Sequence, residues 1–236
     1  MHRFFLQQDI PESGNLILHE KPLMHQMSAV LKLKAGESVI LFNGSGRDFE
    51  FRIAKISPQA VFGHITKVSL NKRDPILQIH LYQAMIKKNN FEWVLQKCTE
   101  LGVKTFIPIL SERSIKKGLN RERAEKIVRE AVEQSGQDII PSITDPISFS
   151  EAINRIGRGE TIILCDQSGT LLPNERFFEG KLIHIFVGPE GGYSEKEINA
   201  VREHGGMVLS LGQRVLRAET ASVAVVSLAL ALIFKQ

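Results

Sequence analysis

Three short, almost wholly apolar segments constrain the fold of this chain more than any other feature. They are Thr161–Cys165, Leu182–Val187 and Met207–Leu211. Strands of this kind are buried on both faces, as in a parallel sheet that is covered by helices. We therefore predict an α/β fold with a parallel sheet and helices on both faces.

The neighbouring segments fit the same alternation of strand and helix. We predict further strands at Ile76–Ala84 and Val103–Leu110, and a C-terminal helix from Ala218 to Phe234. Ser148 and Ser194 are each followed three residues later by a glutamate, a spacing that predicts a capping box at a helix start. Apolar residues at helical spacing predict another helix with one apolar face, formed by Phe91, Val94, Leu95, Cys98 and Leu101.

The first part of the chain reads differently. Runs such as Ser38–Phe42 and Phe49–Ile53 are β-branched or alternating, and residues 43–46 (Asn-Gly-Ser-Gly) between them favour a hairpin turn. The polar segment 71–75 ends in proline and marks a boundary. We predict a small β-barrel over residues 1–72 and an α/β domain over residues 73–236.

Composition excludes several classes of protein. The 236 residues carry 30 Lys+Arg and 26 Asp+Glu, a net charge of +4, and 43% of them are hydrophobic. Disorder and a disulfide scaffold are therefore excluded. The longest apolar stretch, 221–234, is short for a membrane span, and the two cysteines form no ligand motif, so we expect a cytoplasmic protein. Local basic clusters, as in 87–117, permit a polyanionic partner.

Ligands of open α/β sheets bind beyond the carboxyl ends of the strands. This rule selects the loops after Cys165, Val187 and Leu211. The second loop contains Gly188, Gly191 and Gly192, which allow close approach of a backbone to a ligand, while Glu190 disfavours a phosphate there. The third loop places two arginines, Glu219 and Thr220 beside an apolar helix.

Other standard sites are not indicated. The chain has no phosphate-binding glycine motif, no serine-hydrolase elbow and no histidine spacing typical of a metal site. His80 and His184 lie within predicted strands, where a structural role is favoured. The residues alone predict an α/β enzyme or binding protein whose neutral-to-cationic pocket is built from three loops.

The two C-terminal loops resemble a paired signature of a known family. Residues 188–192 (Gly-Pro-Glu-Gly-Gly) and 211–221 (Leu-Gly-Gln-Arg-Val-Leu-Arg-Ala-Glu-Thr-Ala) are similar to those of the SPOUT methyltransferases that modify N3 of a uridine in 16S ribosomal RNA. Residues 91–103, 111–114 and 133–136 also resemble this family, and residues 3–5 and 30–46 resemble its N-terminal PUA-like barrel. The resemblance spans nearly the whole chain. It departs at Gln137, where the family usually has an arginine.

This resemblance implies a trefoil-knotted α/β domain, bound S-adenosylmethionine, and a homodimer with the active site at the subunit interface. It implies methylation of N3 of uridine 1498 in 16S ribosomal RNA of the small subunit. Arg217 and Arg214 would stabilise the developing anion, and Glu190 or Glu219 would accept the proton or hold an arginine. The cofactor would contact Leu164, Asp166, Val187, Gly188, Pro189, Glu190, Gly191, Gly192, Leu211, Gly212, Val215, Leu216, Arg217 and Thr220. The RNA would contact Arg3, Lys87, Lys88, Arg113, Lys116 and Lys117, and no metal is expected.

Two alternatives stay open. A SPOUT enzyme of this kind could methylate a ribose 2′-oxygen, and a chain without catalysis could serve as a ribosome-assembly factor that binds RNA. The sequence does not distinguish Glu190 from Glu219 as proton acceptor. It also leaves open whether the substrate is naked RNA or an assembled subunit, what Gln137 changes, and how strong the dimer is.

Overall fold

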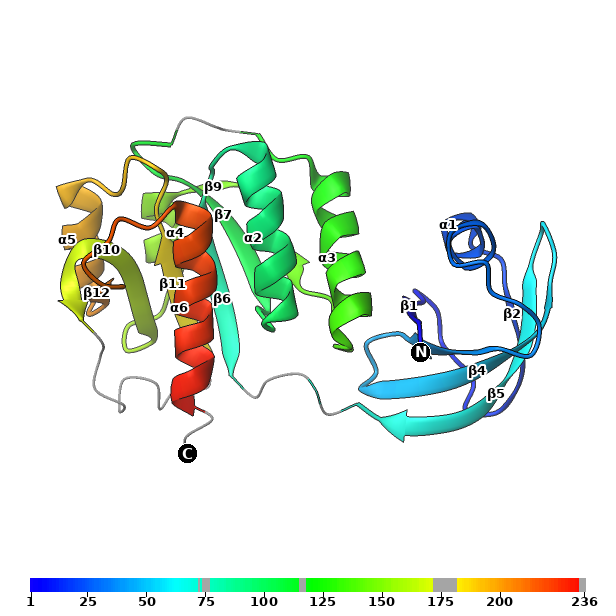
Figure 1. The fold of residues 1–236 in the computed structure, drawn as a ribbon. Coiled ribbons are helices and arrows are strands. Elements are labelled where there is room, and N and C mark those ends of the chain that lie inside the picture. Colours follow the sequence, from blue (N-terminus) through cyan, green and yellow to red (C-terminus); the bar gives the residue numbers. More distant parts are fainter. Residues whose placement is uncertain (72, 74–76, 115–117, 172–181, 234–236) are drawn as a thin grey trace. The chain divides into compact units, whose positions relative to one another are not determined.

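Two compact units make up the chain (Figure 1). The structure is a computed structural model that describes residues 1–71, 73, 77–114, 118–171 and 182–233. The first unit contains Met1–Asp74 together with Val132–Ile140, and the second contains Pro75–Ala131 together with Pro141–Gln236. The division into 1–72 and 73–236 stays a prediction, and the first unit differs from it by including Val132–Ile140.

The first unit contains a five-stranded sheet in the order β1-β3-β4-β5-β2. A buried cluster that includes Phe4, Met27, Leu41 and Phe51 forms its core. Residues 21–30 form a short α-helix followed by a π-helical turn. The elements are β1 (Arg3–Phe5), β2 (Gly14–Leu18), α1 (Lys21–His25), η1 (Gln26–Val30), β3 (Ser38–Phe42), β4 (Arg47–Ile56) and β5 (Val61–Leu70).

The predicted hairpin joins β3 to β4, which pair in antiparallel fashion. Gly44 and Gly46 have φ values of 83° and 77°, a region that glycine enters without the steric cost of a Cβ atom. The Asn43 side chain accepts a hydrogen bond from the Ser45 amide at 3.3 Å. The turn is therefore set by local residue chemistry, which explains why the sequence predicts it.

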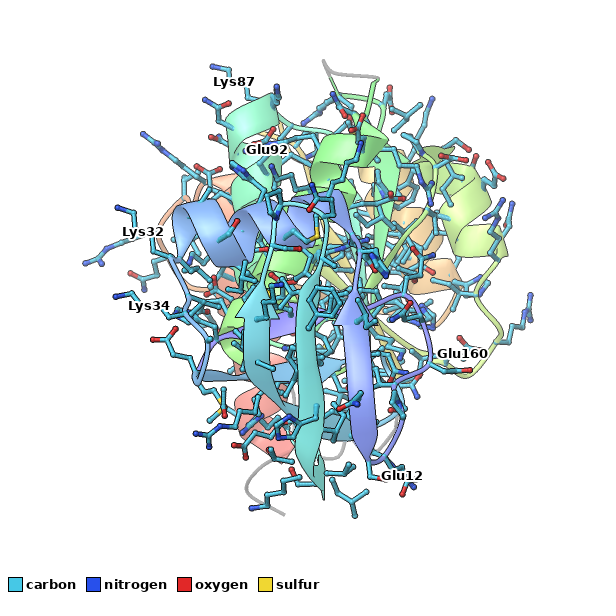
Figure 2. All side chains as sticks on the ribbon, turned by 90° about the vertical axis from the view of Figure 1, so that its right-hand side faces the viewer. Glu12, Lys32, Lys34, Lys87, Glu92 and Glu160 are labelled. Carbon is cyan, nitrogen blue, oxygen red and sulfur yellow. The ribbon has the colours of Figure 1, made fainter. Side chains whose placement is uncertain are left out.

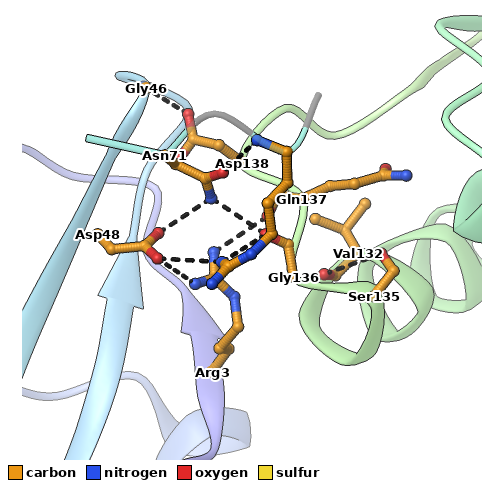
Figure 3. Close-up of polar contacts among 10 residues, drawn as sticks. Arg3, Gly46, Asp48, Asn71, Val132, Ser135, Gly136, Gln137 and Asp138 are labelled. Carbon is orange, nitrogen blue, oxygen red and sulfur yellow. Dashed lines mark hydrogen bonds and ion pairs between the residues drawn. The ribbon is translucent and has the colours of Figure 1, made fainter. Parts of the chain in front are cut away.

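A buried polar network connects β1 with the segment that follows α3 (Arg121–Ser135) (Figure 3). Arg3 forms an ion pair with Asp48 at 2.7 Å and donates to the carbonyl of Gln137 at 3.1 Å. Asn71 donates both to Asp48 and to the carbonyl of Gly136, each at 3.0 Å. Residues from four distant parts of the sequence thus complete one another's hydrogen bonds within the first unit.

The second unit contains a parallel sheet in the order β12-β10-β11-β6-β7-β8, with β9 also paired to β7. The predicted α/β class with a parallel sheet is confirmed. Besides α3, whose last turn belongs to the first unit, the elements are β6 (Gln78–Ala84), α2 (Lys88–Glu100), β7 (Thr105–Leu110), β8 (Ser142–Ile143), β9 (Ile147–Ser148), α4 (Phe149–Asn154), β10 (Thr161–Leu171), β11 (Leu182–Val187), α5 (Glu195–Glu203), β12 (Met207–Ser210) and α6 (Ala218–Ile233).

Helices cover both faces of this sheet, with α2 packed on α6 and α4 packed on α5 (Figure 1). Successive side chains on a strand point to opposite faces. Accordingly Tyr82 and Ala84 belong to the core cluster under α4 and α5, whereas the buried Gln83 accepts a hydrogen bond from Ser222 of α6. Cys98 of α2 is fully buried, as its place on the apolar helix face predicts.

The capping spacings predict the starts of two helices, α4 and α5. In α5 the capping box is complete, because Ser194 and Glu197 bond each other's backbone amides. At α4 the Ser148 side chain accepts from the Glu151 amide at 3.2 Å, while the Glu151 carboxylate pairs with Arg155 at 2.6 Å.

Strand β10 differs from the prediction of a strand that ends at Cys165. Cys165 and Thr170 both pair with Leu209 of β12, so residues 166–169 bulge out and the strand resumes after them. A Cβ atom at Gly169 would lie 2.6 Å from the backbone of Val208. The glycine therefore allows the close approach that restores pairing, a feature typical of bulges.

A buried histidine cluster lies across β6 and β11. His184 is 4% exposed; its Nδ1 lies 3.2 Å from the Tyr82 hydroxyl and its Nε2 lies 2.6 Å from a Glu160 carboxylate oxygen. The His80 ring contacts the His184 ring edge to face. Burial lowers the pKa of His184 below its ordinary 6.5, although the bond to Glu160 acts in the opposite direction. Both ring nitrogens of His184 have partners, which supports the predicted structural role.

Within the described ranges, none of the helices combines the length and the apolar character that crossing a membrane requires.

The polar network of the first unit predicts a large stability effect at Arg3. We expect Arg3→Met to lower the free energy of unfolding by about 3 kcal/mol, because it breaks a buried ion pair. The value is at the lower end of the range for such a change, since Asp48 keeps Asn71 and Arg73 as partners. Denaturant unfolding measures the change. Arg52→Met, at an exposed site on β4, is the control, and an equal small effect of both variants would contradict the structural role of Arg3.

His184 predicts a pH dependence of stability. A histidine whose pKa is lower in the folded state binds fewer protons there than in the unfolded state. The contribution of His184 to the free energy of unfolding is therefore fully present above pH 6.5 and is lost as the pH falls toward the folded pKa. We expect the loss between about pH 7.5 and about pH 5 to be smaller in His184→Gln than in the unaltered chain. The exposed His19→Gln is the control, and an identical loss in all three proteins would refute the assignment.

Candidate functional site

The functional site follows from the pairing of three parallel strands. Strand β10 lies between β11 and β12, so the carboxyl ends of all three lie at one edge of the sheet. The bulge after Cys165 and the loops that follow Val187 and Ser210 therefore converge there. This is the arrangement predicted from the rule for open α/β sheets.

These loops enclose a cavity of about 520 Å³. Backbone, apolar and charged groups all contribute to it, and all of the residues belong to the second unit. Its lining consists of Arg113, Cys165, Asp166, Gln167, Val187, Gly188, Pro189, Glu190, Gly191, Gly192, Tyr193, Leu209, Leu211, Gly212, Arg214, Val215, Leu216, Arg217, Ala218 and Ala221.

Two loops of the cavity depend on glycine. Gly192 closes a turn by donating to the Pro189 carbonyl at 2.9 Å, with a φ of 68°. Gly212 has a φ of 117°, and a Cβ atom there would meet no other atom. The requirement at both positions is thus a backbone conformation that other residues rarely adopt, and the loops present main chain to the cavity.

The charged lining is mixed. Arg113, Arg214 and Arg217 are exposed cations at the cavity, and Glu190 is an exposed anion. Asp166 is engaged locally, because its carboxylate accepts from the Ser168 amide at 2.9 Å and from the Ser168 hydroxyl at 2.7 Å. The cavity therefore suits a ligand with neutral and polar parts and an anionic group nearby.

Two further polar side chains of the lining are held in the neutral form. Burial raises the pKa of the Cys165 thiol to about 12, with a smaller contribution from Asp166. Burial also raises the pKa of Tyr193 well above 10, again with help from neighbouring acidic groups. Neither group is a nucleophile or base near neutral pH.

All the predicted cofactor residues except Leu164 and Thr220 lie in the cavity wall. Leu164 is fully buried in the core under α4 and α5. Thr220 is exposed on the first turn of α6. The lining residues that sequence reasoning missed are Cys165, Gln167, Tyr193, Leu209, Ala218 and Ala221, of which Ala218 and Ala221 are three residues apart on α6 and could have been found from that spacing.

The predicted catalytic residues separate into two groups. Arg214, Arg217 and Glu190 line the cavity. Glu219 is half-buried outside the lining, and its carboxylate accepts from the Asn90 side chain at 3.2 Å. Glu219 thus connects the first turn of α6 to the first turn of α2.

The predicted RNA contacts are scattered. Lys87 and Lys88 are exposed at the start of α2, where Lys87 projects outward (Figure 2). Arg3 is buried in its ion pair with Asp48 and stacks over the Phe42 ring at 4.7 Å, so the geometry favours a structural role for it. Gln137, the departure from the family pattern, is buried in the first unit and is absent from the cavity wall. Lys116 and Lys117 lie outside the described residues.

Among the residues that the structure describes, no group of three or more His, Cys, Asp or Glu side chains is placed to hold a metal ion.

Comparisons with known proteins agree with this architecture. A family model described as an RNA methyltransferase domain matches residues 72–230, and one described as an RNA methyltransferase PUA domain matches residues 29–66. The match to the second model confirms the predicted PUA-like domain. These matches define the class as RNA methyltransferases with an N-terminal PUA domain.

Named relatives define the family more closely. Ribosomal RNA small subunit methyltransferase E of Aquifex aeolicus is 31% identical over 97% of this chain and 98% of its own length. The Bacillus subtilis protein of the same name is 27% identical over 94% and 93%. The Neisseria gonorrhoeae protein of that name, solved bound to S-adenosylmethionine, superposes with a TM-score of 0.91 at 29% identity and covers 98% of both chains. This chain belongs to the ribosomal RNA small subunit methyltransferase E family of RNA methyltransferases.

Proposed function

We propose that this chain transfers a methyl group from S-adenosylmethionine to N3 of a uridine, uridine 1498, in 16S ribosomal RNA of the small subunit. One observation carries the proposal. The cavity at the carboxyl ends of β10, β11 and β12 is built from glycine-rich backbone in a fold that matches, over 98% of its length, a family member bound to that cofactor.

The cavity wall fits the cofactor. Gly188, Gly191, Gly192 and Gly212 offer backbone groups to the adenine and to the amino-acid tail, and the volume of about 520 Å³ lies in the range of small-ligand sites. A Cβ atom at Gly188 would lie 3.1 Å from the Tyr193 ring, so a larger residue at this part of the cradle would force the ring to shift. The bound cofactor supplies a methyl group already activated by a sulfonium, which leaves the protein the tasks of orientation and charge stabilisation.

Charge on the base has to be managed by this chain's own residues. Methylation forms the N3–carbon bond as the sulfur–carbon bond breaks, and the N3 proton leaves the uracil. Arg217 and Arg214 stabilise the negative charge that develops on the base. Glu190 accepts the proton, an assignment that its place in the cavity wall supports over Glu219, which is bonded to Asn90.

The remaining interactions follow from the positions of the basic residues. Lys87, Lys88 and Arg113 hold the RNA backbone together with the PUA-like domain, and Lys116 and Lys117 extend this set.

The enzyme acts in the cytoplasm, where its substrate is found, and as a homodimer. Half-exposed apolar side chains of α6, including Val223, Leu228 and Leu230, and the 40% exposed Trp93 of α2 support a second copy on this side of the second unit. The trefoil knot stays a prediction.

Methyl transfer from labelled S-adenosylmethionine to small ribosomal subunits that lack the modification tests the proposal. Nucleoside mass analysis should give N3-methyluridine at one site. A 2′-O-methylated nucleoside would instead establish ribose methylation. Binding of subunits without binding of the cofactor would establish an assembly factor, and naked RNA assayed in parallel identifies the physical state of the substrate.

Arg217 should affect turnover more than binding. We expect Arg217→Ala to lower kcat about 100-fold, the usual effect of removing one group that stabilises a developing anion, and to leave cofactor affinity within a few fold. Single-turnover methylation and calorimetric titration measure the two quantities. Unchanged turnover would remove Arg217 from the reaction.

Glu190 and Glu219 form a matched pair for assigning the proton acceptor. We expect Glu190→Gln to lower kcat by about 100-fold or more, as expected for loss of a general base, and Glu219→Gln to lower it much less, because Gln can still bond Asn90. The reverse order of effects would transfer the role to Glu219.

A further inference from the structure

A buried carboxylate in the second unit makes more bonds than its helix requires. Glu197 of α5 is 7% exposed. Its carboxylate accepts from the Ser194 amide at 2.9 Å, from the Glu112 amide at 3.0 Å and from the Ser111 hydroxyl at 3.2 Å. Two of these three donors lie about 85 residues away in the sequence, just beyond the end of β7.

The capping box explains only the first of these bonds. A capping glutamate satisfies the backbone amide of the N-cap residue, here Ser194, and a glutamate is rarely fully buried unless it is paired. Burial of a carboxylate carries a large desolvation cost unless several donors compensate it. The bonds to Ser111 and Glu112 supply that compensation, so Glu197 fixes the turn 111–114 against the start of α5.

The turn held by Glu197 carries Arg113 into the cavity wall. Two hydrogen bonds close the turn. The Ser114 amide donates to the Ser111 carbonyl at 3.0 Å, and the Ser111 amide donates to the Ser114 hydroxyl oxygen at 3.1 Å. Arg113 then reaches the glycine loop, where its Nη1 donates to the Gly191 carbonyl at 2.8 Å. Gly191 lies close enough that a Cβ atom there would be 3.5 Å from Arg113 Cβ.

The guanidinium of Arg113 keeps capacity for a ligand. It has five N–H donors, its side chain is exposed, and the bond to Gly191 uses one of its terminal nitrogens. Lying in the cavity wall with Arg214 and Arg217, it meets the incoming anionic RNA, whose phosphate oxygens pair well with a forked cation.

We propose that Glu197 is a positioning residue for RNA, which acts by holding the 111–114 turn and thereby Arg113 at the cavity. The inference rests on the proposed function, because it takes RNA as the ligand of Arg113. Glu197 touches neither cofactor nor RNA. Its removal therefore weakens the RNA interaction through Arg113 and leaves the cofactor loops in place.

A double-mutant cycle tests this inference on the full-length protein. Arg113→Ala and Glu197→Gln should each raise the KM for small-subunit RNA about tenfold, as expected for loss of one charge-assisted bond, and Glu197→Gln should leave cofactor affinity unchanged. Their combination should be no worse than Arg113→Ala alone, since coupled residues are not additive. Glu195→Gln, an exposed acid in the first turn of α5, is the charge-matched control and should match the unaltered protein.

Multiplied effects in the double variant would overturn the inference, and so would a parallel loss of cofactor affinity in Glu197→Gln. Ser111→Ala removes one bond to the turn, keeps the helix cap, and should raise KM in the same direction if Glu197→Gln proves unstable. If the unaltered protein binds S-adenosylmethionine but methylates no RNA, the proposed function fails. The RNA affinities of the same four proteins, measured by filter binding, then take the place of KM in the cycle. Absence of RNA affinity would refute the inference as well.

Discussion

The parallel pairing of β10 with β11 and with β12 is the constraint on which the site depends. Because the three strands run in the same direction, their carboxyl ends lie at one edge of the sheet. Three loops that are separated by many residues in the sequence therefore form one cavity. Each loop contributes only a few groups, chiefly the backbone of its glycines or an arginine side chain. The parallel strands bring these groups together into one cavity wall.

Much of the second unit could be predicted because its signals are local. Leu182–Val187 forms a strand with the predicted limits, and its apolar composition reports burial on both faces. The end of β10 could not be predicted in this way. Its continuation past residues 166–169 depends on pairing with Leu209 of β12, a long-range contact that leaves no local pattern.

The same difference separates the predicted from the unpredicted parts of the site. Loop residues such as Gly188 and Gly212 carry a signal, because glycine marks backbone that approaches a neighbour closely or adopts a positive φ. The hydrogen-bond partner of a side chain leaves no such signal in the sequence. The sequence does not reveal that Glu219 bonds Asn90, that Arg3 is buried on Asp48, or that Glu197 bonds the turn after β7. These contacts decide which charged groups remain available for chemistry.

A crystal structure of this protein with S-adenosylmethionine tests most directly whether the cavity at the ends of β10, β11 and β12 holds the cofactor. We expect ligand density in the cavity between the loops 188–194 and 211–217, in contact with Gly188 and Gly212, with Arg217 and Glu190 facing the methyl group. Cofactor bound elsewhere on the chain, or a cavity that stays empty at saturating cofactor, would contradict this expectation.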